Sequence, residues 1–205
     1  INFINTIFLQ QTRIFVMQNF QAITFTNSGY LDFTMNLLRS AEMNSDKLNI
    51  IVYCTDIKSY DYIRKNNYDA ILLNPEKEIS KKLSPWKAGD GEFGKIMISK
   101  FEAIHDSLQK NKYVLYIDGD VVIKKDFNEY FQKNINNNDF LFQLDYNPKR
   151  IEQNELCAGF MFIKSSKKSV ELFNPEPKKV NEIIELPSHD QTYLNLNKKE
   201  FKYKF

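Results

Sequence analysis

Two aspartates separated by one glycine are the residues of this sequence best suited to chemistry. Asp118, Gly119 and Asp120 directly follow residues 113–117, an apolar and aromatic run of strand length. Two carboxylates this close repel each other unless one is protonated or a cation lies between them. Carboxylate oxygens suit Mg²⁺ and Mn²⁺, ions that commonly share their coordination with a diphosphate. The triplet therefore predicts a metal site with Asp118 and Asp120 as ligands.

The elements around this triplet predict an α/β fold. Expected strands at 21–25, 48–54 and 70–73 alternate with expected helices, and the strand at 113–117 follows another helix. Such alternation is typical of three layers, with a sheet between helices and right-handed crossovers. Open sheets of this kind bind ligands beyond the carboxyl ends of their strands, which is where the triplet lies. Further strands are expected at 140–144 and 157–163, and a last helix at 190–197.

Length and composition limit the domain organisation. The 205 residues predict one domain at 18–205. Residues 1–17 are treated as a leader extension without a function. Residues 74–94 contain three glycines, Pro85 and Trp86 and predict a functional loop, a lid or acceptor platform.

Charge and cysteine content exclude several classes of protein. The net charge of +2 gives no electrostatic argument for a partner that is a nucleic acid or a membrane surface. Cys54 and Cys157 are too few for a disulfide framework and are expected to be reduced and buried. Residues 1–16 contain no span of about 20 apolar residues, so no membrane anchor is expected. A cytoplasmic location follows as an expectation, bacterial or in the host cytoplasm of a virus.

Residues 113–122, YVLYIDGDVV, resemble the DxD segment of GT-A glycosyltransferases, in particular the nucleotide-diphospho-sugar transferase family, which is related to the glycogenin-like enzymes. The resemblance extends from about Ala22 to Asn195. It implies a GT-A (Rossmann-like) three-layer sandwich with a central mixed, mostly parallel sheet. Within this domain it implies a nucleotide-binding half at about 18–120 and an acceptor half at about 121–205. It also implies a metal-dependent transferase that moves a sugar from a UDP-sugar donor to a glycan or protein acceptor and retains the anomeric configuration, with Mn²⁺ or Mg²⁺ as the cofactor.

The resemblance assigns residues to the nucleotide-sugar donor. Asp56 matches an aspartate that faces the uracil and ribose, although an aspartate here is equally suited to cap the following helix. Lys100, and not Lys95, Lys110 or Lys112, matches a basic residue that approaches the donor phosphates. The implied donor-binding residues are Thr26, Asn27, Ser28, Tyr30, Asp56, Lys100, Asp118, Gly119, Asp120, Cys157, Ala158 and Gly159.

The resemblance also implies catalytic residues near the transferred sugar. Asp190 and Gln191 match an Asp-Gln pair at the start of a helix, where Asp190 with Ser188 is also suited to cap the helix. Asp145, at the end of the expected strand 140–144, is a further candidate. The sequence has Cys157 where the family usually has asparagine. After Gln191 it also has no histidine of the kind that supplies a third metal ligand in the glycogenin-like enzymes.

Two alternatives remain open at the level of sequence. A haloacid-dehalogenase-like phosphatase also carries Asp-x-Asp after an apolar strand, and Asp118 would then be its nucleophile. A module that binds a nucleotide sugar without turnover would keep the same fold. The expected partners of the transferase are a UDP-sugar and a glycan or glycoprotein acceptor.

Overall fold

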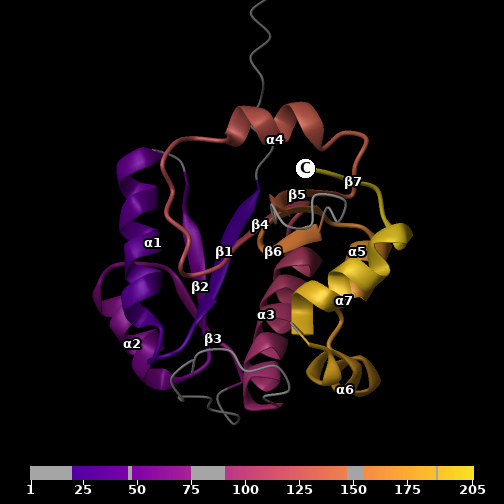
Figure 1. Ribbon diagram of the computed structural model, residues 1–205. Helices are drawn as coiled ribbons and strands as arrows, with labels where there is room; N and C mark the ends of the chain where they lie inside the picture. The colour runs from indigo at the N-terminus through magenta and orange to yellow at the C-terminus, as the bar shows by residue number, and fades with distance from the viewer. Residues whose placement is uncertain (1–19, 46–47, 75–90, 147–154, 188) are drawn as a thin grey trace, which may run out of the picture.

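A seven-stranded sheet forms the centre of the computed structural model (Figure 1), which describes residues 20–45, 48–74, 91–146, 155–187 and 189–205. Its strands are β1 (Gln21–Thr26), β2 (Ile50–Cys54), β3 (Ala70–Leu72), β4 (Tyr113–Ile117), β5 (Phe140–Asp145), β6 (Glu155–Lys164) and β7 (Tyr203–Lys204).

The strand order is β3-β2-β1-β4-β6-β5-β7. Strands β3, β2, β1 and β4 run parallel, β6 is antiparallel to both β4 and β5, and β7 is parallel to β5. This arrangement confirms the predicted mixed, mostly parallel sheet. The chain leaves β1 for β2 on one side and returns to β4 on the other, so a topological switch point lies between β1 and β4.

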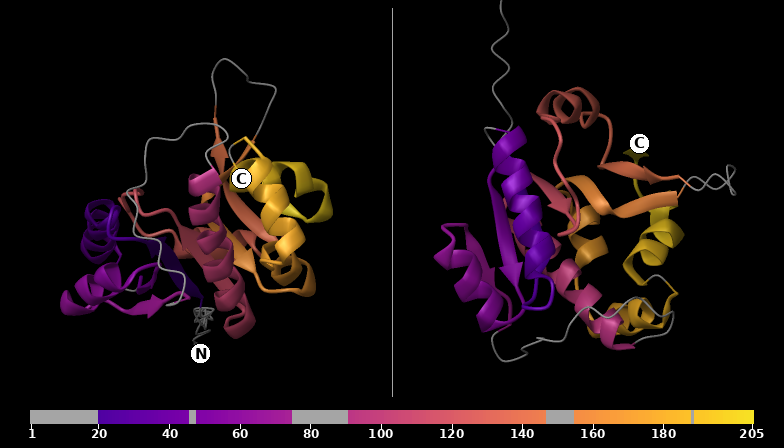
Figure 2. Two further views of the ribbon diagram at one scale, coloured as in Figure 1. Left: turned by 90° about the horizontal axis from the view of Figure 1, so that it is seen from below. Right: turned by 60° about the vertical axis from the view of Figure 1, so that its left-hand side comes forward.

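Helices cover both faces of this sheet. One apolar cluster joins the sheet to α1, α2 and α4, and a second cluster joins the opposite face to α3, α5, α6 and α7. Figure 2 shows α1 and α2 on one side of the molecule, and α3 with the C-terminal helices on the other. The bounds are α1 (Leu31–Asn44), α2 (Ile57–Lys65), α3 (Gly91–Lys110), α4 (Asn128–Asn134), α5 (Lys167–Phe173), α6 (Pro177–Glu185), α7 (His189–Asn197) and the 3₁₀ helix η1 (Lys198–Glu200).

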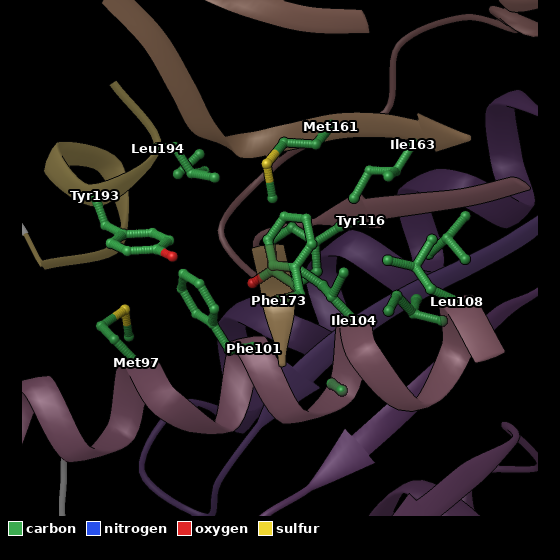
Figure 3. Close-up of a cluster of buried hydrophobic side chains, with 14 of the residues drawn as sticks. Met97, Phe101, Ile104, Leu108, Tyr116, Met161, Ile163, Phe173, Tyr193 and Leu194 are labelled. Carbon is green, nitrogen blue, oxygen red and sulfur yellow. The ribbon is translucent and has the colours of Figure 1, made fainter. Parts of the chain in front are cut away.

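Strand β4 shows how the sequence directs side chains to the two faces. Tyr113, Leu115 and Ile117 belong to the cluster with α1 and α4, whereas Val114 and Tyr116 belong to the cluster with α3. Tyr116 lies among side chains of α3 and α7 (Figure 3). Because side chains alternate along a strand, the residue after Ile117 is directed to the α3 face. The alternation of β4 therefore directs Asp118 toward α3.

Three sequence expectations need correction. Residues 91–94, expected in a loop, form the first turn of α3, and residues 75–90 of that loop lie outside the described residues. Helices α5 and α6 were not expected, because Pro175 and Pro177 look like helix breakers. Pro177 instead occupies the first turn of α6, where its missing N–H leaves no hydrogen bond unmade.

The two cysteines are free, as expected, but their environments differ. Cys54 is buried, whereas Cys157 is only half-buried, because it lies at an irregular part of β6 beside the carboxyl end of β4. In the ranges that the structure describes, no helix is both long and apolar enough to cross a membrane. The proposed leader, residues 1–17, lies outside these ranges.

Candidate active site

Polar residues from two strands meet at the switch point between β1 and β4. Strand β1 ends at Thr26 and continues into Asn27 and Ser28, and β4 continues into Asp118, Gly119 and Asp120. The two strands are parallel neighbours, so these segments leave the same edge of the sheet. This edge is where open α/β sheets bind their ligands.

Asp118 is held by one carboxylate oxygen. Its Oδ1 accepts hydrogen bonds from the Nζ of Lys100 at 3.1 Å and from the hydroxyl of Tyr116 at 2.5 Å. Its backbone N–H donates to the carbonyl of Gly159 at 2.8 Å. A Cβ added at Gly159 would lie 2.7 Å from Oδ2 of Asp118, a distance too short for an ordinary contact. Gly159 therefore leaves room for the second oxygen of Asp118.

Lys100 is a buried cation between two aspartates. Its side chain is 2% exposed, and its Nζ also donates to Oδ2 of Asp190 at 2.7 Å. The Nζ lies 4.6 Å from the centre of the Tyr116 ring, within range of a cation–π interaction. Burial lowers the pKa of Lys100, but the Asp118 and Asp190 carboxylates raise it further, so the net shift is upward. The ammonium group therefore stays charged.

Negative charge exceeds positive charge at this site. Burial raises the pKa of Asp118 and the carboxylate of Asp190 adds to this, while the charge of Lys100 opposes both. Asp120, exposed on the same turn as Asp118, adds a third carboxylate to this part of the molecule. An additional cation would relieve this repulsion. Among the described residues no group of three or more His, Cys, Asp or Glu is placed to hold a metal ion.

Tyr30 and Gly119 lie on the α1 side of the site. The pKa of Tyr30 is raised by burial and by Asp120, with which its hydroxyl makes a hydrogen bond. A Cβ at Gly119 would lie 2.9 Å from Oγ1 of Thr34 and 3.1 Å from the Tyr30 ring. The Thr34 hydroxyl in turn donates to Oγ1 of Thr26 at 2.8 Å. Glycine at 119 thus permits close packing of the Asp-Gly-Asp turn on α1.

Asp56 has the capping role that sequence offered as an alternative. Its Oδ1 accepts from the backbone N–H of Ser59 at 2.7 Å and caps α2. Its Oδ2 accepts from the N–H of Ser28 at 2.7 Å, and the residue is 1% exposed. Asn27 accepts from the N–H of Gly29 at 3.0 Å. These bonds fix the loop after β1, and a contact of Asp56 with a nucleotide stays a prediction.

Helix α7 supports the irregular part of β6. The pairing of β5 with β6 shifts register between Phe142 and Gln143, opposite residues 157–161. Oε1 of Gln191 accepts from the N–H of Ala158 at 3.2 Å, and its Nε2 donates to Oδ2 of Asp145 at 2.8 Å. Gln191 therefore links two predicted site residues to each other. The neighbouring Cys157 thiol has its pKa raised by burial.

Asn195, one helical turn after Gln191 on α7, also supports β6. It accepts from the N–H of Leu156 at 2.9 Å and donates to the carbonyl of Leu156 at 3.1 Å. These bonds satisfy the backbone N–H and C=O of Leu156. They attach α7 to the first residues of β6, the strand that contains Gly159.

The structure brings most predicted site residues together, although in two groups. Lys100, Asp118, Gly159 and Asp190 form one contact network, and Gln191 joins it to Asp145 through α7 and β6. The loop after β1 forms the second group with Asp56. Sequence reasoning missed Tyr116, Thr34 and Asn195. Of these only Tyr116 carried a signal, since it lies two residues before Asp118 and thus on the same face of β4.

The sheet order and the polar residues at the switch point define an open α/β domain with a candidate ligand site between β1 and β4. The family model described as nucleotide-diphospho-sugar transferase matches residues 47–204, and the chain belongs to this family. A UDP-galactose:fucoside alpha-3-galactosyltransferase of Dictyostelium discoideum is 26% identical over 196 aligned residues, which cover 83% of this chain and 30% of the relative. The chain thus spans less than a third of that protein.

Solved structures show the same fold. The glycosyltransferase GlyE of Streptococcus pneumoniae TIGR4 matches 91% of this chain and 45% of its own, with a TM-score of 0.59 and 19% identity. An active-site mutant of LgtC matches 90% of this chain and 71% of its own, with a TM-score of 0.61 and 14% identity. Mouse xyloside xylosyltransferase 1 matches 88% and 82%, with a TM-score of 0.54 and 14% identity. The fold is that of the GT-A glycosyltransferases.

Proposed function

We propose that this protein transfers a sugar from a UDP-sugar donor to a glycan or protein acceptor, and that Asp118 and Asp120 hold a Mn²⁺ or Mg²⁺ ion at the donor diphosphate. The observation that carries this proposal is the excess of carboxylates around the single buried Lys100 at the switch point. Membership of the nucleotide-diphospho-sugar transferase family supports the assignment of these carboxylates to a cation at the donor diphosphate.

The residues present fit a divalent cation. Oδ1 of Asp118 is occupied by two donors, and the described residues place no hydrogen-bond donor on its Oδ2. Asp120 is exposed and follows on the same turn. Each aspartate can therefore offer oxygen to a hard cation, with water and diphosphate as further ligands. When bound, such an ion would offset the negative charge that develops on the departing diphosphate.

The protein's own residues would orient the donor. Lys100 fixes the Asp118 and Asp190 carboxylates and contributes the positive charge that is present before any ligand binds. Asp190 and Gln191 lie in the first turn of α7, and Gln191 contacts Ala158 and Asp145. We assign Asp190, Gln191 and Asp145 to orientation of the sugar. Oε1 of Gln191 already accepts the N–H of Ala158, which favours positioning over nucleophilic attack.

The proposed transfer retains the anomeric configuration, as the resemblance to glycogenin-like enzymes implies. Tyr30, Asn27 and Ser28 are assigned to the nucleotide, because they lie on the β1 side of the switch point. The half-buried Cys157 and its neighbour Ala158 are assigned to the donor sugar, because they precede Gly159 at the carboxyl end of β4.

Release of UDP from a panel of UDP-sugars in the presence of Mn²⁺ tests this function. Asp118→Asn and Asp120→Asn are each expected to lower the rate by about 100-fold or more, because each removes a carboxylate ligand of the cation that would offset the charge on the departing diphosphate. Asp106→Asn is the matched control, since Asp106 lies on α3 away from the switch point and pairs with Lys110. Unchanged rates in both site variants would contradict the proposal.

The same assay separates the alternatives. Binding of UDP without release from any donor would favour the module that lacks turnover. Hydrolysis of an aryl phosphate, lost in Asp118→Asn, would favour the phosphatase, but membership of the transferase family argues for the sugar transfer.

A further inference from the structure

Tyr116 is a buried tyrosine whose polar end reaches the candidate active site. It lies on β4, is 0% exposed, and packs in the cluster that joins the sheet to α3 and α7 (Figure 3). Its hydroxyl donates to Oδ1 of Asp118 at 2.5 Å, and its ring lies 4.6 Å from the Nζ of Lys100. One side chain thus contacts both charged groups.

This contact restricts the Asp118 carboxylate. Lys100 and Tyr116 both donate to Oδ1, and Gly159 leaves the space in which Oδ2 lies. Rotation of the carboxylate would break two hydrogen bonds at once. Hydrogen bonds from the surrounding shell commonly fix the orientation of ligands that bind metals, and their loss typically weakens metal binding by 10–100-fold.

We propose that Tyr116 is a positioning residue, whose hydroxyl holds Oδ1 of Asp118 so that Oδ2 is presented to the cation and the diphosphate. This inference rests on the proposed function, because it assumes a divalent cation at Asp118. Tyr116 itself touches neither the cation nor the donor. Its ring also supports Lys100, and Tyr116→Phe leaves that ring in place.

The matched control for Tyr116→Phe is Tyr53→Phe. Tyr53 is also buried, and its hydroxyl donates at 2.7 Å to Asp106, a carboxylate on α3 outside the site. Each variant removes one hydroxyl that donates to one carboxylate. Calorimetric titration with UDP in the presence of Mn²⁺, together with thermal unfolding, compares the two variants.

We expect both variants to unfold at a lower temperature than the original protein. Only Tyr116→Phe should also weaken Mn²⁺-dependent binding of UDP, by about tenfold, a change typical of a lost partner of a metal ligand. Equal UDP affinities in Tyr116→Phe and the original protein, with a lower unfolding temperature, would overturn the inference and leave Tyr116 a structural residue.

Two further results keep the inference separate from the proposed function. If the original protein does not bind UDP with Mn²⁺, the proposed function fails, and the inference fails with it. If Tyr116→Phe does not fold, a crystal structure of the original protein with Mn²⁺ and UDP decides. Ligation through Oδ2, with the Tyr116 hydroxyl still on Oδ1, is expected, and ligation through Oδ1 with that hydrogen bond broken would overturn the inference.

Discussion

Helix α3 contributes a lysine to two clusters built from the same chemical groups. The site cluster consists of Lys100, Asp118 and Tyr116, and the surface cluster consists of Lys110, Asp106 and Tyr53. In both, the lysine and the tyrosine hydroxyl donate to the aspartate. The aspartate side chains are similarly exposed, at 35% and 34%, whereas the lysines are 2% and 61% exposed.

The pKa values of the two aspartates are shifted in opposite directions. The pKa of Asp106 is lowered, because the hydrogen bonds from Lys110 and Tyr53 outweigh its burial. The pKa of Asp118 is raised, because burial and the second carboxylate of Asp190 outweigh Lys100. The same three chemical groups therefore lower the pKa of the aspartate in the surface cluster, whereas its pKa is raised in the site cluster. Burial and the second carboxylate, Asp190, make the difference.

Replacement of the lysines should separate the clusters most strongly. Lys100→Met leaves Asp118 and Asp190 without their cation, and we expect a loss of about 3 kcal/mol or more in the free energy of unfolding. Lys110→Met breaks an exposed pair and should cost less than about 1 kcal/mol. Urea denaturation of both variants measures the difference. Equal losses would show that burial does not distinguish the two clusters.

A methyl group added at position 159 should damage the site cluster alone. The Cβ of Gly159→Ala would lie 2.7 Å from Oδ2 of Asp118, so the carboxylate must move away from its present place. We expect kcat/KM for UDP-sugar hydrolysis to fall by at least about tenfold, since small displacements of positioned groups have effects of this order or larger. Asp106→Asn, on α3 away from the switch point, is the control. A variant as active as the original protein would mean that the position of Oδ2 is unimportant.

The smallest expected effect is the loss of the stability that the Asp106 charge contributes, as the pH is lowered. Because the pKa of Asp106 is lower in the folded state than its ordinary value of 3.8, the stabilisation from its charge is present above that pH. It is lost as the pH falls through the lowered pKa. The difference in unfolding free energy between the original protein and Asp106→Asn should therefore be present at pH 7 and shrink at about pH 2. A difference that grows in acid would contradict the assigned direction.

Much of the fold could be predicted because it depends on local pattern. The apolar run of β4 and the alternating helices and strands before it are short-range signals, and they placed Asp118 at the carboxyl end of a central strand. Helices α5 and α6 were missed because they are short and rich in lysine, and Pro177 begins α6. Short helices of this kind depend on tertiary packing, which sequence pattern does not contain.

The site was predicted by residue type and resemblance, but its connections were not. Lys100 and Asp190 are 90 residues apart in the chain and meet only because α3 and α7 pack on the same face of the sheet. Tyr116 was interpreted only as part of a buried strand. Its hydroxyl matters because of Asp118, a relation that needs the geometry of the strand end. Asn195 supports β6 through hydrogen bonds to the backbone of Leu156, 39 residues away in the chain, which the sequence does not reveal.

Calorimetric titration of the protein with UDP, in Mn²⁺ and in EDTA, tests the central claim most directly. If Asp118 and Asp120 form a cation site at the switch point, UDP should bind in Mn²⁺, and EDTA or the double variant Asp118→Asn/Asp120→Asn should abolish binding. Equal binding of UDP in Mn²⁺ and in EDTA would contradict a cation at this site. Absence of UDP binding under both conditions would contradict a nucleotide donor altogether.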